Sequence, residues 1–124
     1  MKKMTITGNI GRDAEVRVNT QTGNEFASFS VAVSVGTKDK PRTDWIEVVC
    51  NNKLAVVAKH YVKKGGKVLV EGFPTAYAFN QDGVLHARIR ITAQHLELLG
   101  RKVEDDEENQ TFSTAPVEEE IPTF

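Results

Sequence analysis

The sequence is short of the residues that mark several classes of protein. Its single cysteine, Cys50, excludes an internal disulfide and cannot by itself supply a cysteine metal cluster. No apolar run approaches the roughly 20 residues that a membrane-spanning helix needs. Residues 1–6 include two lysines but no apolar segment and no small-residue cleavage site, so we expect no signal peptide. These absences favour a cytoplasmic protein that does not bind membranes.

Motifs for catalysis are also missing. Cys50 and the three histidines, His60, His86 and His95, are the residues from which a metal or nucleophilic site could be built. They form no HxH, HExxH or CxxC spacing, and we interpret all four as structural. The Lys-Gly-Gly-Lys segment at 64–67 lacks the pattern of a phosphate-binding loop and fits the end of a helix instead. We therefore predict no enzymatic activity, no metal site and no cofactor.

Charge is divided unevenly along the chain. Residues 1–103 hold all 16 Lys and Arg residues and nine carboxylates, for a net charge of +7. Residues 104–124 hold the other eight carboxylates and no Lys or Arg, for a net charge of −8. A basic body with an acidic end is typical of a domain that binds a polyanion and carries an acidic tail. A solvated surface followed by a disordered end explains the charge alone equally well.

Most of the chain before Gly100 alternates between apolar and polar residues, which is the pattern of half-buried strands. In the segment 26–35, Phe29, Val31 and Val33 fall on one face, and small Ser and Ala residues fall on the other. Small side chains leave room for a ligand to lie against the sheet. We predict strands over residues 4–10 (continued by 15–18), 26–35, 45–50, 67–72, 75–79, 85–92 and 94–99.

One helix is predicted over residues 52–62, where apolar residues recur at helical spacing. Asn51 or Asn52 can cap its start, and the glycine pair at 65–66 can end it. Five strands with one helix between the third and the fourth indicate an all-β OB-fold barrel. A strand face of this fold binds oligonucleotides or oligosaccharides.

After Gly100 the composition becomes acidic and polar, so we divide the chain into three parts. Residues 1–100 form the OB-fold domain. Residues 101–117 are predicted to be a disordered linker, because they contain too few apolar residues to build a core. Residues 118–124 form an acidic tip that ends on an apolar residue.

Several short motifs, in this order along the chain, resemble the bacterial single-stranded DNA-binding protein family. They are GNIGRD at 8–13, EVR at 15–17, FSVAV at 29–33, TDWIEVV at 43–49, LA at 54–55, VA at 57–58, YVKKG at 61–65 and VLVEG at 68–72. The resemblance implies an OB-fold, usually in a homotetramer around which DNA wraps. It implies non-catalytic, sequence-independent coating of single-stranded DNA in replication, recombination and repair, in the cytoplasm at the nucleoid.

Such binding needs flat aromatic surfaces for the exposed bases and positive charges for the phosphates. Trp45 matches the family's tryptophan, and its place beside Glu47 puts it on the face opposite the core. Phe79 matches a second family aromatic, and Tyr77 lies two residues away on the same strand face. Each of the three rings could instead belong to a core or an interface.

The predicted phosphate contacts are basic residues, each of which could also be a plain surface charge. Arg88 and Arg90 share the outward face of one strand, and Arg17 and Lys53 match basic positions of the family. The full set is Arg17, Lys38, Lys40, Arg42, Lys53, Lys63, Lys64, Arg88 and Arg90.

The sequence departs from the family in places that affect binding. Thr37 and Asn51 stand where aromatic residues are common, and Glu47 stands where a basic residue is common. The segment 75–78 lacks the usual arginines and lysine, and the loop at 36–43 is short. Fewer rings and charges predict weaker binding or a shorter footprint on the strand.

The tip suits an apolar pocket with a basic rim on a replication or repair protein. Family members usually end in Asp-Ile-Pro-Phe, whereas Thr123 is inserted before the last residue here. The alternative is a tail that only increases solubility. The predicted partner-binding residues are Glu118, Glu119, Glu120, Ile121, Pro122, Thr123 and Phe124.

Two other identities share the fold. A primosomal replication protein N or an RNA-binding OB domain generally lacks an acidic tail that ends in Phe. A DNA-coating protein encoded by a phage or plasmid would have the same function in another genome, and the sequence alone does not separate it from a chromosomal one.

Overall fold

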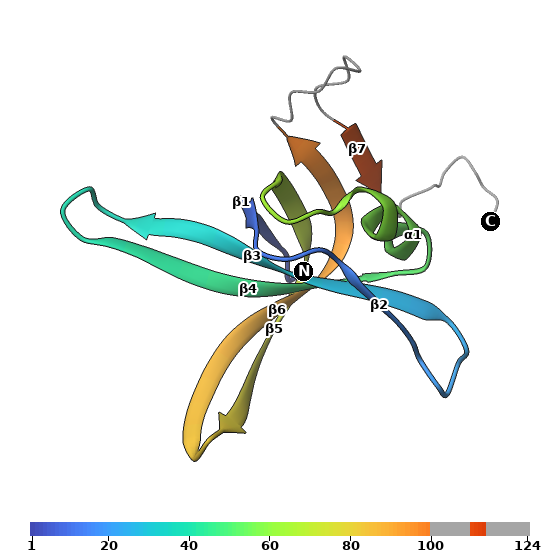
Figure 1. Cartoon of the computed structure of the whole chain (residues 1–124), viewed down its shortest axis with the longest axis horizontal. Helices are drawn as coiled ribbons and strands as arrows, with labels where there is room; N and C mark the ends of the chain where they lie inside the picture. Colours follow the sequence, from blue (N-terminus) through green and yellow to red (C-terminus); the bar gives the residue numbers. More distant parts are fainter. Residues whose placement is uncertain (100–109, 114–124) are drawn as a thin grey trace.

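The computed structural model describes residues 1–99 and 110–113 of the chain. In this part of the chain, seven strands and one helix follow one another (Figure 1). They are β1 (Met4–Ile10), β2 (Glu15–Val18), β3 (Glu25–Gly36), β4 (Pro41–Asn51), α1 (Asn52–Tyr61), β5 (Lys67–Gln81), β6 (Val84–Leu99) and β7 (Gln110–Ser113). No helix among the described residues is long and apolar enough to cross a membrane.

The strands form one sheet that closes on itself. Its order is β1-β5-β6-β4-β3-β2, and the end of β1 also pairs with β3 through Asn9↔Ala32 and Ile10↔Val31. β1 and β2 are the two halves of the first predicted strand, separated by a break at 11–14. The helix lies between β4 and β5, which are the third and fourth strands of the predicted barrel. The topology is therefore that of the predicted five-stranded OB-fold barrel, with β7 added.

The core fills the barrel because inward positions alternate along every strand. Phe29 and Val31 of β3, Val48 of β4 and Ile91 and Leu96 of β6 are completely buried. Each such side chain contributes roughly 1.5–3 kcal/mol by leaving water. The buried face of α1 packs against this cluster and closes one end of the barrel through Leu54, Ala55 and Ala58.

The helix begins at the predicted Asn52 and ends at Tyr61, one residue before the predicted end, but its caps differ from the prediction. Asn51 precedes the helix and makes no side-chain capping hydrogen bond. Asn52 instead adopts a left-handed backbone (φ 53°), which asparagine tolerates, and the chain turns there directly from strand to helix. At the other end the predicted glycine cap is wrong, because the C-cap is Val62, which has an extended backbone and whose N–H donates to the Ala58 carbonyl at 3.0 Å. Gly65 (φ 91°) lies three residues beyond this cap, in the turn that leads to β5.

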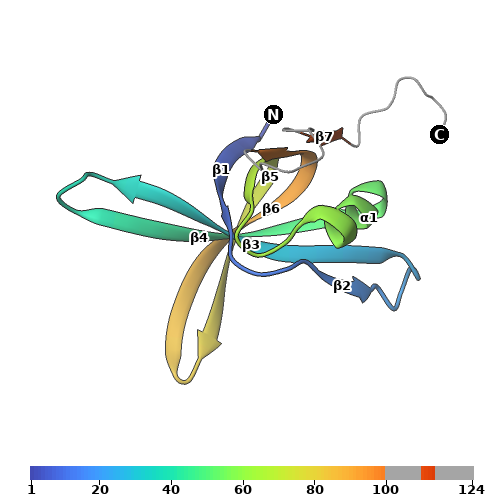
Figure 2. The ribbon, with the colours of Figure 1, turned by 45° about the horizontal axis from the view of Figure 1, so that its top comes forward.

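Long hairpins extend away from the barrel (Figure 1, Figure 2). We call residues 33–44 the β3–β4 arm and residues 73–92 the β5–β6 arm. The sequence predicted two separate strands in each side of the β5–β6 hairpin, whereas β5 and β6 are each continuous, with a register shift beside Gly72. A Cβ at Gly72 would lie 2.0 Å from the Thr92 carbonyl oxygen, so only glycine fits this crossing.

Strand β7 is a correction to the predicted linker at 101–117. It pairs antiparallel with β6, from His95↔Ser113 to Leu98↔Gln110. β6 pairs with β4 only from Ile89 to Thr92, so the backbone groups of its last residues are left for another strand to bind. The other residues of the predicted linker, and the whole tip at 118–124, lie outside the described residues.

Candidate nucleic-acid interface

The outer face of the barrel is defined by the register of β3, β4, β5 and β6. On β3 this face carries small residues, and Ser30 and Ala32 lie opposite Glu47 and Trp45 of β4. The parallel pairing of β4 and β6 then places Arg90 beside Glu47. The outer face is therefore lower over the small side chains of β3 and is bordered there by the larger side chains of the neighbouring strands.

Trp45 lies on this outer face, and its exposure of 48% confirms that it is not part of the core. Its ring covers Gly11, where a Cβ would come within 2.5 Å of the indole Cζ3. The Gly11 N–H donates to the Ser30 carbonyl at 2.9 Å and so fixes this backbone against β3. The indole therefore has a backbone support beneath it and keeps much of its surface open to a base.

The β5–β6 arm carries a row of stacked rings, which we call the ring row: Tyr77, Phe79 and His86. The Tyr77 and Phe79 centroids are 6.0 Å apart with planes at 27°, and those of Phe79 and His86 are 5.2 Å apart at 18°. His86, interpreted from the sequence as structural, joins the row because it pairs directly with Phe79 across the hairpin. The tight turn at 81–84, which sets this register, was the signal that could have revealed it.

Two arginines of β6 lie over the rings of β5. The Arg88 guanidinium carbon is 5.3 Å from the Phe79 centroid, and that of Arg90 is 4.3 Å from the Tyr77 centroid. Both distances are within the range of cation–π attraction. The predicted residues Tyr77, Phe79, Arg88 and Arg90 thus form one continuous group on this arm.

Glu47 connects this group to β4. Its Oε1 accepts a hydrogen bond from the Tyr77 hydroxyl at 2.8 Å and another from the Arg90 Nε–H at 3.1 Å. Burial, and then the hydrogen bond to Glu47, raise the pKa of Tyr77 above its usual value. The phenol therefore stays protonated and continues to donate to the carboxylate.

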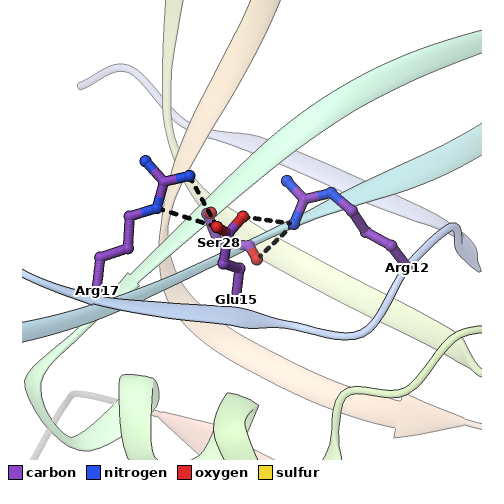
Figure 3. Close-up of polar contacts among 4 residues, drawn as sticks. All are labelled: Arg12, Glu15, Arg17 and Ser28. Carbon is purple, nitrogen blue, oxygen red and sulfur yellow. Dashed lines mark hydrogen bonds and ion pairs between the residues drawn. The ribbon is translucent and has the colours of Figure 1, made fainter.

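Arg17 lies on β2, where it pairs with Glu15 (Figure 3). Its Nη2 and Nε are 2.8 Å and 3.2 Å from Glu15 Oε2, and the hydrogen bond and charge of Arg17 lower the pKa of this carboxyl. On the other side of Glu15, Arg12 lies 3.6 Å from Oε1 and donates to the Ser28 carbonyl at 3.2 Å. Arg12 was not among the predicted contacts, and Arg17 already has an anionic partner.

The remaining predicted cations do not gather around the ring row. Lys38 and Lys40 are exposed in the turn of the β3–β4 arm, and Arg42 lies 3.4 Å from Asp44. The helix lies on the other side of the barrel from the β5–β6 arm in both views (Figure 1, Figure 2). The predicted cations that begin or follow this helix are Lys53, Lys63 and Lys64.

The described residues offer no cluster of three or more His, Cys, Asp or Glu side chains that could hold a metal. Cys50 is completely buried in the core, and this burial raises the pKa of its thiol to about 12. A neutral buried thiol is a poor nucleophile.

A closed barrel with an outer face of rings and guanidinium groups is the arrangement of an OB-fold domain that binds nucleic acid. The family model described as "Single-strand binding protein family" matches residues 1–99. The chain belongs to this family, as its motifs predicted.

Two curated relatives support this family assignment, and one solved structure supports the fold. The chain is 33% identical over 125 residues to the single-stranded DNA-binding protein of Neisseria meningitidis serogroup A, covering 96% of this chain and 68% of the relative. It is 31% identical over 110 residues to that of Bacteroides thetaiotaomicron, covering 82% and 68%. A solved SSB complex with ssDNA from Plasmodium falciparum has a TM-score of 0.62 at 22% identity, over 75% of this chain and 86% of the other. This structural likeness confirms the OB-fold.

Proposed function

We propose that this chain binds single-stranded DNA without sequence preference and without catalysing a reaction. The observation that carries the proposal is the ring row, which lies on the same outer face as Trp45 and has arginines over two of its rings. The names of the relatives from Neisseria and Bacteroides support it, since both are single-stranded DNA-binding proteins.

Bases stack on the rings, and any base has a flat face that suits them. Each stacked base is worth roughly 1–3 kcal/mol, which is enough to hold a strand without reading its sequence. Trp45 provides one platform at the base of the β3–β4 arm, and Phe79 provides another at the centre of the ring row. The small residues of β3 leave room for the backbone of the strand between them.

The exposed cations bind phosphates and so displace counterions from the DNA, which makes the affinity depend on salt concentration. Arg88 and the exposed lysines of the β3–β4 arm are best placed for this role. The cations at the helix contact DNA that is long enough to continue around the barrel, and they contribute less to the binding of a short oligonucleotide. Arg17 and Arg42 contribute less, because each already lies beside a carboxylate.

The wider role that we propose is protection of single strands in replication, recombination and repair, by a homotetramer in the cytoplasm at the nucleoid. In this role residues 1–100 hold the strand, residues 101–117 act as a tether that includes β7, and residues 118–124 recruit replication and repair proteins. The acidic residues before an apolar end support the recruiting role of the tip.

Fluorescence titration with oligo(dT) tests the binding function. Trp45 is the only tryptophan, so its quenching reports stacking at one position. We expect quenching on binding and affinity that falls steeply with salt. Binding with neither quenching nor salt dependence would remove the basis of the proposal.

Deletion of residues 118–124 tests the division of roles. We expect DNA affinity to be unchanged or higher, and pulldown of replication and repair proteins to be lost. A loss of DNA affinity in the truncated chain would contradict this division.

A further inference from the structure

Arg88 and Arg90 form a matched pair that differs in one respect. Both lie on the outer face of β6, and each lies over a ring of β5. Arg90 makes an ion pair with Glu47 at 3.1 Å, whereas Arg88 makes none with any described residue. A DNA strand that passes along the arm therefore meets a positive charge at Arg88 that no carboxylate in the described part of the chain balances, and one at Arg90 that Glu47 neutralises.

Glu47 reaches Arg90 because the sheet places the two side by side. They are paired directly in the parallel β4–β6 ladder, and Tyr77 comes from the neighbouring strand β5. The Glu47 side chain is 23% exposed and that of Arg90 is 41% exposed, so this ion pair is partly shielded from water. Charge-assisted hydrogen bonds of this kind are among the stronger ones in proteins.

A carboxylate on a face that binds phosphates would repel them if it were unpaired. Here its charge is balanced by Arg90, and its Oε1 also holds the Tyr77 hydroxyl. The contact joins three strands and fixes both a ring and the guanidinium over that ring. Fixing these side chains in advance reduces the entropy that is lost when a base stacks on them.

We propose that Glu47 is a positioning residue for strand binding: it holds Tyr77 and Arg90 as a preformed stacking platform and leaves phosphate neutralisation on this arm to Arg88. The inference rests on the proposed function, because it assigns separate tasks to two cations of the same site. It also explains why an acidic residue is compatible with a position where the family commonly has a basic one.

The dependence of oligo(dT) affinity on salt tests the inference. Each phosphate contact on a single strand contributes about 0.7 to the slope of log K against log salt concentration. We would measure this slope for Arg88→Gln and Arg90→Gln, each made in the natural chain and in Glu47→Gln. Thermal unfolding of each variant checks that the barrel stays folded.

We expect Arg88→Gln to reduce the slope by about 0.7 in both backgrounds. Glu47→Gln alone should raise the slope by about 0.7, because it frees Arg90 to contact a phosphate. The double variant Glu47→Gln, Arg90→Gln removes both charges of the pair, so its slope should return to that of the natural chain. Arg90→Gln in the natural chain leaves Glu47 unpaired, and this variant should bind oligo(dT) more weakly because the carboxylate then repels phosphates. A merely structural role of Glu47 would change affinity or stability without making the slope depend on Arg90 in this conditional way.

The result that would overturn the inference is a loss of slope for the double variant Glu47→Gln, Arg90→Gln as large as that for Arg88→Gln in the natural chain. If the double variant does not fold, Glu47→Gln alone decides the matter, because a slope no steeper than that of the natural chain would also overturn the inference. Failure of the proposed function looks different, since the natural chain itself would then show no salt-dependent binding of oligo(dT).

Discussion

The β3–β4 arm and the β5–β6 arm are both long antiparallel hairpins on the same barrel, yet their side chains differ. The β5–β6 arm holds the ring row with Arg88 and Arg90 over its rings. The β3–β4 arm has no aromatic residue, and Lys38, Lys40 and Arg42 are its cations. Stacking requires side chains in fixed positions, which cross-strand register supplies, whereas a phosphate contact requires only a charge within reach. We therefore expect the β3–β4 arm to contribute phosphate contacts alone, and the β5–β6 arm to contribute stacking together with the charge of Arg88.

Loss of the central ring should have the largest effect. Phe79→Ala removes the side chain that touches both Tyr77 and His86 and that lies beneath Arg88. We expect oligo(dT) affinity to fall by roughly 1–3 kcal/mol, or about 5- to 150-fold, and the loss to persist at high salt. The measurement is a titration of Trp45 fluorescence at two salt concentrations.

Asn80→Ala is the matched control for this variant. Asn80 is the next residue of β5, and its side chain lies on the opposite face of the arm. It should bind as the natural chain does. Equal losses for the two variants would mean that the arm contributes through its fold and that the ring row does not stack on bases.

Loss of charge from the β3–β4 arm should have a smaller effect that depends on salt. The double variant Lys38→Gln, Lys40→Gln removes two exposed cations, so the slope of log K against log salt should fall by about 1.4. At high salt its affinity should approach that of the natural chain.

The control is Lys59→Gln on the helix, which removes one exposed cation far from both arms and should leave the slope unchanged. A loss for the double variant that is as large at high salt as at low salt would contradict the assignment of this arm to phosphates.

The positions of single residues relative to the sheet were predictable from the sequence. Strand side chains alternate with a period of two, so the faces of Phe29, Val48 and Trp45 follow directly from the pattern. The order of strands and helix was sufficient to predict the barrel. The same alternation placed Tyr77, Phe79, Arg88 and Arg90 on outward faces.

Contacts between strands were not predictable in this way, because they depend on register between segments far apart in the sequence. Glu47 and Arg90 are 43 residues apart, and only the parallel pairing of β4 and β6 brings them together. Gly11 beneath Trp45 belongs to a loop that no periodicity describes. Arg17 was predicted because it matches a basic position of the family, and its pairing with Glu15 could be inferred only from their spacing of two along one strand face.

The smallest predicted effect concerns the hydroxyl that joins the β5–β6 arm to β4. Burial and the bond to Glu47 raise the pKa of Tyr77 above 10.0 in the folded chain, so the folded state holds this proton more tightly than the unfolded state does. The associated stability is present below pH 10, and it is lost as the pH rises through the unfolded value towards the higher folded one. Tyr77→Phe lacks the hydroxyl and should show none of this loss.

Urea unfolding of both proteins from neutral pH to about pH 11 measures the difference in their free energies of unfolding. The natural chain should lose stability relative to Tyr77→Phe only above about pH 10. A difference in the free energy of unfolding that stays constant over the whole pH range would contradict this prediction. The contact between Tyr77 and Glu47 would then not set the stability of the β5–β6 arm apart from that of the β3–β4 arm, for which the described residues show no such link.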